Sequence, residues 1–317
     1  MMQATIYLGS KCNMSCAYCH READEKKDGI SDDFLQRLKE MKPERVKFMG
    51  GEPTLYMEEI KMVVAALPEA EFAISTNGMN LEEYLPYFRD HRFLIVISYD
   101  GCENKERGYD PFTKLIDYPW LAVSTTIYHG NTDFKAILKS FAEKERIIGR
   151  RLSFFPHMAH HTNNANSEFA LTKAAAEDVI GEFKEMVGSY MKDLFLRGIR
   201  NIRYEGMYNG LYRRYKARYL FGETYCVNRN LMKFNAKGEA FDCLYIRDHA
   251  LGEDWQSSEA KLIDENFPAC RTCSVYFMCG AGCVKSKSRA IDCYIKKSIY
   301  TWFKDEYESY KEAGYAD

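Results

Sequence analysis

The sequence predicts an α/β protein whose N-terminal part is a partial (β/α)6 barrel of the TIM type. Two observations carry this prediction. Short runs rich in β-branched and aromatic residues recur along the first half of the chain, and amphipathic stretches separate them. Strands that alternate with helices form parallel sheets. Six strands are expected, at Thr5–Leu8, Arg45–Met49, Phe72–Ser75, Leu94–Ser98, Leu121–Ile127 and Leu152–Phe155.

Several helices show a start signal or helical periodicity. Ser31, followed by Asp32 and Asp33, predicts a capped helix that runs to about Lys42. Asn80 is the expected cap of a second helix, which ends near Arg89. Later helices are expected at Lys173–Arg197, Tyr208–Phe221 and Ala290–Tyr315.

The helix expected at Tyr208–Phe221 carries tyrosines at helical spacing with cations between them. The tyrosines are Tyr208, Tyr212, Tyr215 and Tyr219, and the cations are Arg213, Arg214, Lys216 and Arg218. An aromatic and basic face could bind RNA, but a helix that packs its tyrosines inward and solvates its charges is commoner. We therefore expect the tyrosines to pack against the core.

Composition argues against several classes of function. The 317 residues carry a formal net charge of −2, which disfavours binding to nucleic acid or to an anionic membrane. No apolar run approaches the roughly 20 residues that span a bilayer. The first residues lack the basic and apolar segments of a signal peptide, so we expect a cytoplasmic protein. In that reducing compartment, metal binding explains the 11 cysteines better than disulfides do.

Three cysteines follow the first expected strand, as Cys12, Cys16 and Cys19 in the spacing C-x3-C-x2-C. A structural zinc or a closed iron–sulfur cluster takes about four protein ligands, and the next cysteine in the chain is Cys102. Three thiols would hold a [4Fe–4S] cluster and leave one iron open to a ligand that is not protein. A zinc knuckle or a chance group of thiols is the alternative.

Distinctive residues also mark the ends of the next three strands. The run Gly50-Gly51-Glu52-Pro53 follows the second strand, Ser75-Thr76-Asn77-Gly78 ends the third, and Ser98-Tyr99-Asp100-Gly101 ends the fourth. Parallel βα folds gather their active-site residues at the carboxyl ends of the strands. The order therefore predicts one active site built around the cysteines.

The cysteine spacing, with Tyr18 just before Cys19, resembles the radical SAM superfamily. The resemblance implies that the open iron binds S-adenosylmethionine (SAM) and that an electron from the cluster cleaves it to a 5′-deoxyadenosyl radical. The GGEP run matches the stretch that contacts the SAM amino group in that family. Asn77 and Ser98 resemble the positions that reach the SAM ribose and carboxylate. The residues expected to bind SAM are Tyr18, Gly50, Gly51, Glu52, Pro53, Ser75, Asn77 and Ser98.

Seven cysteines in the last third of the chain resemble the SPASM domain, an extension of one branch of that superfamily. The resemblance implies two auxiliary [4Fe–4S] clusters, which makes three clusters in all. Auxiliary cluster I would be held by Cys226, Cys243 and Cys283. Its fourth position is completed by a non-cysteine group or stays open to substrate, and we expect the open site. Auxiliary cluster II would be held by Cys270, Cys273, Cys279 and Cys293. The expected domains are 1–205, a radical SAM core, and 206–317, a small SPASM domain with a C-terminal helix.

Cys102 and three histidines lie at the expected rim of the site. Cys102 follows the fourth strand, where a thiol could donate a hydrogen atom to a substrate radical. The alternative is a small, buried hydrophobic residue. His157, His160 and His161 follow the sixth strand. A histidine there could act as a base or contact substrate, although polar loop residues are the commoner identity.

Asp242 is a second candidate catalytic residue, because it is the acid beside Cys243. Sulfatase-maturing relatives place an aspartate base directly after the corresponding cysteine, where this chain has Leu244. That difference disfavours formylglycine formation.

The resemblance favours an enzyme that oxidises or crosslinks a ribosomally made peptide, through a thioether, C–C or ether bond. The expected partners are this peptide or small protein and an external electron donor of the flavodoxin or ferredoxin type. A peptide with a leader could also require a separate leader-binding protein. The alternatives are a sulfatase-maturase-like enzyme, a small-molecule dehydrogenase, a peptide epimerase that uses Cys102 as hydrogen donor, and a non-catalytic metal-stabilised binding module.

Overall fold

The computed structural model describes residues 2–19, 29–101, 107–159, 167–224, 231–243, 246–250, 261, 263–283 and 286–316. Within these ranges, the side chains of residues 167, 242–243 and 246–250 are not described. Several predicted site residues therefore lie outside the description, namely Cys102, His160, His161, Cys226 and the side chains of Asp242 and Cys243.

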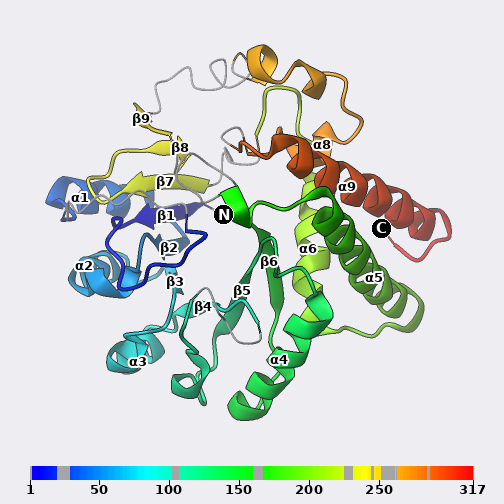
Figure 1. Ribbon diagram of the computed structural model, residues 1–317. Coiled ribbons are helices and arrows are strands. Elements are labelled where there is room, and N and C mark those ends of the chain that lie inside the picture. The colour runs from blue at the N-terminus through cyan, green and yellow to red at the C-terminus, as the bar shows by residue number, and fades with distance from the viewer. Residues whose placement is uncertain are drawn as a thin grey trace.

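A seven-stranded sheet forms the main body of the fold (Figure 1). Its strands are β1 Gln3–Tyr7, β2 Arg45–Met49, β3 Glu71–Thr76, β4 Leu94–Ser98, β5 Leu121–Ile127, β6 Phe154–Met158 and β7 Leu231–Asn235. Their order is β6-β5-β4-β3-β2-β1-β7, and each neighbouring pair is parallel. The predicted α/β fold on a parallel sheet is confirmed.

Two features of the sheet differ from the prediction. The sixth strand begins at Phe154, later than expected, so His157 lies within β6 in register with Thr126 instead of following the strand. Sequence periodicity does not anticipate β7, which pairs with β1 along the whole of that strand. Strand formation depends on neighbours that are distant in sequence, and local propensity cannot supply them.

Helices connect the strands and surround the sheet (Figure 1). The first four are α1 Asp32–Met41, α2 Met57–Ala66, α3 Leu81–Asp90 and α4 Phe134–Ile148, with short 3-10 turns at Pro53–Tyr56, Phe112–Lys114 and Ser167–Phe169. The predicted cap of α1 is confirmed, because the Ser31 hydroxyl accepts a hydrogen bond from the Phe34 amide. Asn80 precedes α3 as expected, but its side chain makes no capping bond.

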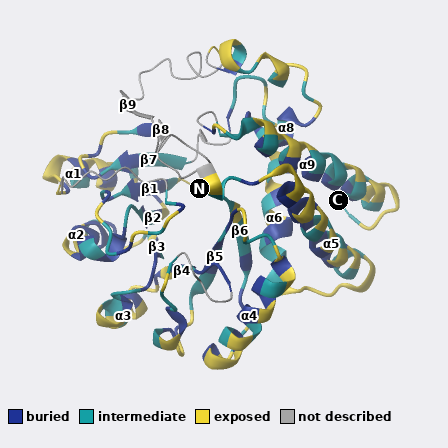
Figure 2. Ribbon diagram, viewed as in Figure 1, coloured by how far each residue is buried: buried dark blue, intermediate teal, exposed yellow. Residues whose placement is uncertain are grey.

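Successive residues of each strand lie on opposite faces of the sheet. One set, which includes Ile6, Phe48 and Ile74, is fully buried in the main hydrophobic core (Figure 2). The residues between them, such as Lys47 and Ser75, lie on the other face, which we call the inner face, and are only half-buried. The core face holds the fold together, and the inner face can present polar groups.

Three long helices pack together next to β6, namely α5 Lys173–Arg197, α6 Ile202–Ala217 and α9 Arg289–Glu312 (Figure 1). The bounds of α5 are those predicted, and those of α9 agree closely. Helix α6 begins earlier than expected, because Asn201 caps it by accepting a hydrogen bond from the Arg203 amide. Residues 205 and 206 both lie inside α6, and the domain boundary between them stays a prediction.

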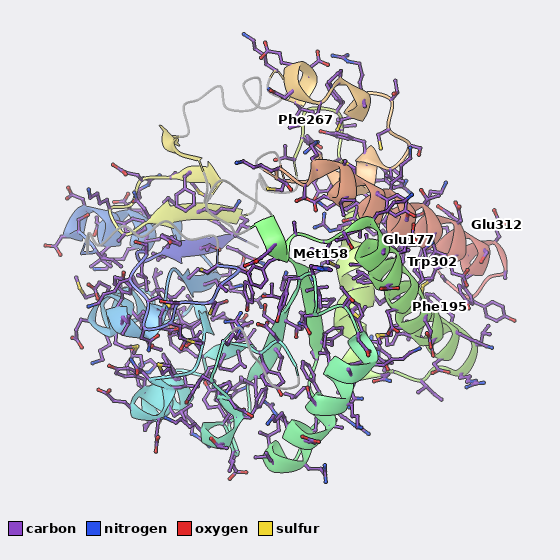
Figure 3. The ribbon with its side chains drawn as sticks, in the orientation of Figure 1. Met158, Glu177, Phe195, Phe267, Trp302 and Glu312 are labelled. Carbon is purple, nitrogen blue, oxygen red and sulfur yellow. The ribbon has the colours of Figure 1, made fainter. Side chains whose placement is uncertain are left out.

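Of the four tyrosines expected on this helix, Tyr208, Tyr212 and Tyr215 lie in α6 and pack against the core as expected, whereas Tyr219 follows its end. Tyr208 and Tyr215 are buried, and the ring centroids of Tyr215 and Tyr307 of α9 are 5.1 Å apart. Figure 3 labels Phe195 of α5 and Trp302 of α9, and the ring centroids of Phe195 and Tyr307 are 6.0 Å apart. This arrangement supports a core role for the tyrosine face and gives the RNA-binding alternative no support.

The remaining C-terminal elements are small. The strands β8 Phe241–Cys243 and β9 Ile246–Ala250 form an antiparallel hairpin, a 3-10 turn spans Pro268–Cys270, and α8 spans Tyr276–Cys279. Ile263, Tyr276 and Ala281 make a second, minor core. Among the described residues, no helix has the length and apolarity needed to cross a membrane.

Candidate active site

The loop that carries Cys12, Cys16 and Cys19 follows the carboxyl end of β1 and is supported from β2. The Gly51 amide donates to the Gly9 carbonyl at 2.8 Å, and the Glu52 amide donates to the Lys11 carbonyl at 2.9 Å. A Cβ at Gly51 would lie 2.3 Å from the Lys11 carbonyl oxygen. Only glycine allows the two backbones to approach this closely. The GGEP run therefore supports the backbone that leads into the cysteines.

Gly51→Ala is expected to destabilise the protein by about 1–3 kcal/mol, the usual effect of overpacking, and to lower its iron content after reconstitution. The added methyl would also lie 2.4 Å from the Ser10 carbonyl oxygen, so the loop before Cys12 must move. Denaturant unfolding and iron analysis measure both effects. The control is Gly210→Ala in α6, where a Cβ meets nothing within 4 Å, and where a gain of about 0.5–1 kcal/mol is expected. If the two variants had the same unfolding free energy and the same iron content, the close backbone approach at Gly51 would not support the cysteine loop.

The Glu52 carboxylate joins the ends of β2 and β3. Its side chain is fully buried, and Oε1 accepts hydrogen bonds from the Thr54 amide at 3.0 Å and from the Thr54 and Thr76 hydroxyls at 2.7 Å each. Its Oε2 accepts a hydrogen bond from the Asn77 amide at 2.8 Å. Buried polar groups need such partners, and this carboxylate has four. The structure thus shows Glu52 as a support of the strand ends, and the SAM contact of the GGEP run stays a prediction.

Asn77 connects Glu52 to the first cysteine of the loop, Cys12. Its Nδ2 donates to Asn13 Oδ1 at 2.8 Å and lies 3.8 Å from Cys12 Sγ. The Met14 amide donates to the same sulfur at 3.4 Å. N–H groups directed at sulfur favour the thiolate form that binds metal. The Cys12 side chain is therefore in a suitable environment for a metal ligand.

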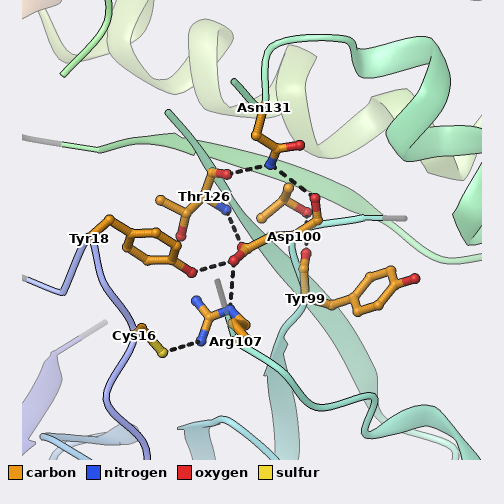
Figure 4. Close-up of polar contacts among 8 residues, drawn as sticks. Cys16, Tyr18, Tyr99, Asp100, Arg107, Thr126 and Asn131 are labelled. Carbon is orange, nitrogen blue, oxygen red and sulfur yellow. Dashed lines mark hydrogen bonds and ion pairs between the residues drawn. The ribbon is translucent and has the colours of Figure 1, made fainter. Parts of the chain in front are cut away.

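Asp100 organises the opposite side of the loop (Figure 4). Its Oδ2 accepts hydrogen bonds from the Tyr18 hydroxyl and, at 2.8 Å, from Arg107 Nε, and its Oδ1 accepts one from the Thr126 amide at 2.9 Å. Asn131 Nδ2 donates to the Asp100 carbonyl at 2.9 Å. This network connects the end of β4 with the end of β5 and with the cysteine loop.

Arg107 extends from Asp100 toward the second cysteine. Its NH1 nitrogen lies 3.9 Å from Cys16 Sγ, and its guanidinium lies 5.5 Å from the centre of the Tyr18 ring. Burial alone would lower the pKa of Arg107, but the Asp100 carboxylate, the Tyr18 hydroxyl and the Cys16 thiol raise it above its usual value. Burial raises the pKa of the Cys16 thiol, and the Arg107 charge opposes that rise. The site thus places a permanent positive charge beside a cysteine sulfur.

The donor set of this loop fits the predicted cluster. Three thiols within eight residues, with N–H donors directed at two of the sulfurs, suit iron–sulfur ligation. Across the described ranges, no three or more His, Cys, Asp or Glu side chains lie close enough together to bind one metal ion. The ligand sets therefore stay predictions.

The described C-terminal cysteines also lie beside cations. Arg289 NH2 donates to Cys270 Sγ at 3.4 Å and to the Ala281 carbonyl at 2.8 Å. Burial raises the pKa of Cys279, Lys296 and Arg214 oppose that rise, and the neighbouring Cys293 and Cys270 thiols add to it. Cys270, Cys279 and Cys293 are thus near enough to influence one another's charge, and the ligand set of auxiliary cluster II stays a prediction.

The N-terminal part of the chain matches a known family. Residues 6–120 match the model described as Radical SAM superfamily. The matched segment contains the three-cysteine loop and the strands β2 to β4. Its curated relatives include a "Probable GTP 3′,8-cyclase" of Archaeoglobus fulgidus, which is 33% identical over 91 residues, or 27% of this chain and 30% of the relative. "Molybdenum cofactor biosynthesis protein moc-5" of Caenorhabditis elegans is 25% identical over 186 residues, or 51% of this chain and 31% of the relative. The matches thus span under a third of either relative.

Solved structures resemble this chain over almost its full length. "Native anSMEcpe with bound AdoMet" has a TM-score of 0.69 and 18% identity, and the match covers 98% of this chain and 99% of that one. The same protein with bound AdoMet and Kp18Cys peptide has a TM-score of 0.68, with the same identity and coverage. At this identity the likeness shows the fold, and the SPASM assignment of the C-terminal part stays a prediction.

The structure places the predicted SAM-binding residues around one edge of the sheet. Ser75 and Ser98 are half-buried near the ends of β3 and β4, and Asn77 is buried beside the cysteine loop. Sequence analysis does not identify Arg107 as a site residue, because it lies in the long segment between β4 and β5 with no motif around it. Asp100 carries a weak signal, its place in the Ser-Tyr-Asp-Gly run at the end of a strand.

Proposed function

We propose that the protein is a radical SAM enzyme that modifies a peptide. The observation that carries this proposal is the loop of three cysteines at the carboxyl end of β1, with donors from Asn77 and Arg107 directed at the Cys12 and Cys16 sulfurs. In this proposal Cys12, Cys16 and Cys19 hold a [4Fe–4S] cluster to which SAM binds. When bound, the cluster and SAM would supply a 5′-deoxyadenosyl radical that abstracts hydrogen from the substrate. The residues of the chain orient the loop and surround it with fixed donors.

Two observations support a peptide as the substrate. The seven C-terminal cysteines resemble the SPASM pattern of peptide-modifying enzymes, and a structure of the same fold is described with a bound peptide. The expected modification is an oxidation or a crosslink, with auxiliary clusters on the C-terminal cysteines accepting the second electron. The proposed partners are an external reductant of the flavodoxin or ferredoxin type and, for a peptide with a leader, a leader-binding protein.

The second candidate is a reaction on a nucleotide, which the curated cyclase relatives favour. Their similarity spans about a quarter of this chain, 27% and 25% for two of them, whereas the structural likeness to anSMEcpe spans 98% of it. We therefore rank the peptide substrate first.

The two candidates are separated by product analysis. Anaerobically reconstituted protein is incubated with SAM, reductant and either GTP or short peptides encoded next to its gene, and the products are analysed by mass spectrometry. The proposal expects a peptide that has lost two hydrogen atoms, and unchanged GTP. Conversion of GTP with all peptides unchanged would favour the second candidate and contradict the first.

A further inference from the structure

The inner face of the sheet carries an unusual group of side chains. Thr5 of β1 is the register partner of Lys47 in β2 and of Lys233 in β7. Register partners in a parallel sheet share a face. Both neighbours of Lys47 in the strand, Val46 and Phe48, are fully buried in the core, so Lys47 extends from the inner face. The row Lys233–Thr5–Lys47 therefore places a hydroxyl between two lysines.

Lys47 has no anionic partner among the residues that the structure describes. Within the described part of the chain, its ammonium has neither a hydrogen bond nor an ion pair, and burial is the sole cause that lowers its pKa. A cation partly withdrawn from water without a partner is unfavourable, and folded proteins keep such groups mainly at functional sites. The Lys47 side chain is half-buried, so part of it stays in contact with solvent.

The position of the row suits recognition of substrate. Lys47 lies three residues before Gly50, at which the chain leaves β2 toward the cysteine loop. At about 3.3 Å per residue, the row lies roughly 10 Å below that edge of the sheet. The α-carbons of Lys47 and Lys233 lie two strands apart, also roughly 10 Å, and both side chains are long and flexible.

We propose that Lys47, Thr5 and Lys233 bind an anionic oxygen group of the substrate, a carboxylate or a phosphate, on the inner face of the sheet. The inference deepens the proposed function and rests on it for the role of the group as a substrate anchor. In a peptide the anchor would be an acidic side chain or the C-terminal carboxylate. With the anionic group held there, the substrate would extend toward the carboxyl ends of the strands, and its reacting carbon would lie near the cysteine loop.

The test is a thermal-unfolding titration of anaerobically reconstituted protein with sodium glutarate and with sodium phosphate, against sodium chloride at equal ionic strength. We expect either anion to raise the melting temperature of the wild type, since a ligand of the folded state stabilises it. Lys47→Met should melt at a higher temperature than the wild type without anion, because the uncompensated charge is gone. Its anion affinity should fall at least about tenfold, the effect of losing about 1.4 kcal/mol of binding.

Two further variants make the result specific. Lys39→Met changes an exposed lysine of α1 and should match the wild type in both respects. Lys47→Gln keeps a polar side chain and should lose the anion response as the methionine variant does. A stronger response to glutarate indicates a carboxylate-bearing substrate, and a stronger response to phosphate a phosphate-bearing one.

Two outcomes would overturn the inference: no rise with either anion in the wild type, or an equal rise in Lys47→Met. The titration requires neither SAM cleavage nor a peptide. An anion response in a protein that fails to cleave SAM would therefore contradict the proposed function alone.

Discussion

Asp100→Asn is expected to destabilise the protein by about 3–5 kcal/mol, the usual effect of breaking a buried ion pair. The side chains of Asp100 and Arg107 are only 2% and 11% exposed, and they meet at 2.8 Å. Asparagine leaves the Arg107 guanidinium buried without its carboxylate and weakens the hydrogen bonds from Tyr18 and the Thr126 amide. Because Arg107 also lies beside Cys16, the iron content of the reconstituted protein should fall as well.

Denaturant unfolding measures the effect, and a double-mutant cycle identifies its cause. Asp100→Asn combined with Arg107→Met removes the uncompensated charge, so the double variant should be more stable than Asp100→Asn alone. The matched surface control is Glu71→Gln. Glu71 forms an ion pair with Arg45 at 2.5 Å, and the side chains of Glu71 and Arg45 are 71% and 44% exposed, respectively. A loss of about 0–1 kcal/mol is expected there. If Asp100→Asn resembled this control, the network would not hold the loop.

Glu52→Gln is expected to destabilise the protein by about 2–4 kcal/mol, because hydrogen bonds to a buried charged acceptor are strong and a buried donor without an acceptor is costly. The carboxylate accepts hydrogen bonds on both oxygens, from the Thr54 amide on one and the Asn77 amide on the other. Whichever way the glutamine amide is turned, its NH2 group faces one of these backbone N–H groups. One buried donor then loses its partner.

The same substitution should weaken metal binding at Cys12, since Asn77 links Glu52 to the cysteine loop. Iron analysis after reconstitution measures this effect beside the unfolding free energy. Glu58→Gln is the control, because its ion pair with Lys61 is exposed and should contribute little. Wild-type stability together with wild-type iron content in Glu52→Gln would show that the strand ends do not depend on this carboxylate.

Much of the fold follows from local patterns in the sequence. Short runs rich in β-branched and aromatic residues identified β2, β4 and β5 with their exact bounds, and the Ser31 capping signal located the start of α1. The cysteine spacing and the GGEP run pointed to one edge of the sheet because their residues occupy the ends of neighbouring strands. Such features depend on residues close in sequence, which is why they can be read there.

The remaining features depend on contacts that sequence spacing does not reveal. β7 pairs with β1 across more than two hundred residues of chain, and only the fold brings Lys233 level with Lys47. Arg107 acquires its role from Asp100 and Cys16, which approach it from two different loops. Glu52 is a predicted SAM contact by resemblance, and the structure adds a role that the resemblance does not indicate, since its carboxylate accepts hydrogen bonds from Thr54, Thr76 and Asn77.

The central claim is that Cys12, Cys16 and Cys19 hold the cluster that cleaves SAM. The most direct test measures 5′-deoxyadenosine released by anaerobically reconstituted, reduced protein. The account predicts release by the wild type and by Cys273→Ala, which alters only a predicted auxiliary ligand. It predicts none from the variant that combines Cys12→Ala, Cys16→Ala and Cys19→Ala. Release of 5′-deoxyadenosine by this triple variant at the wild-type rate would contradict the account.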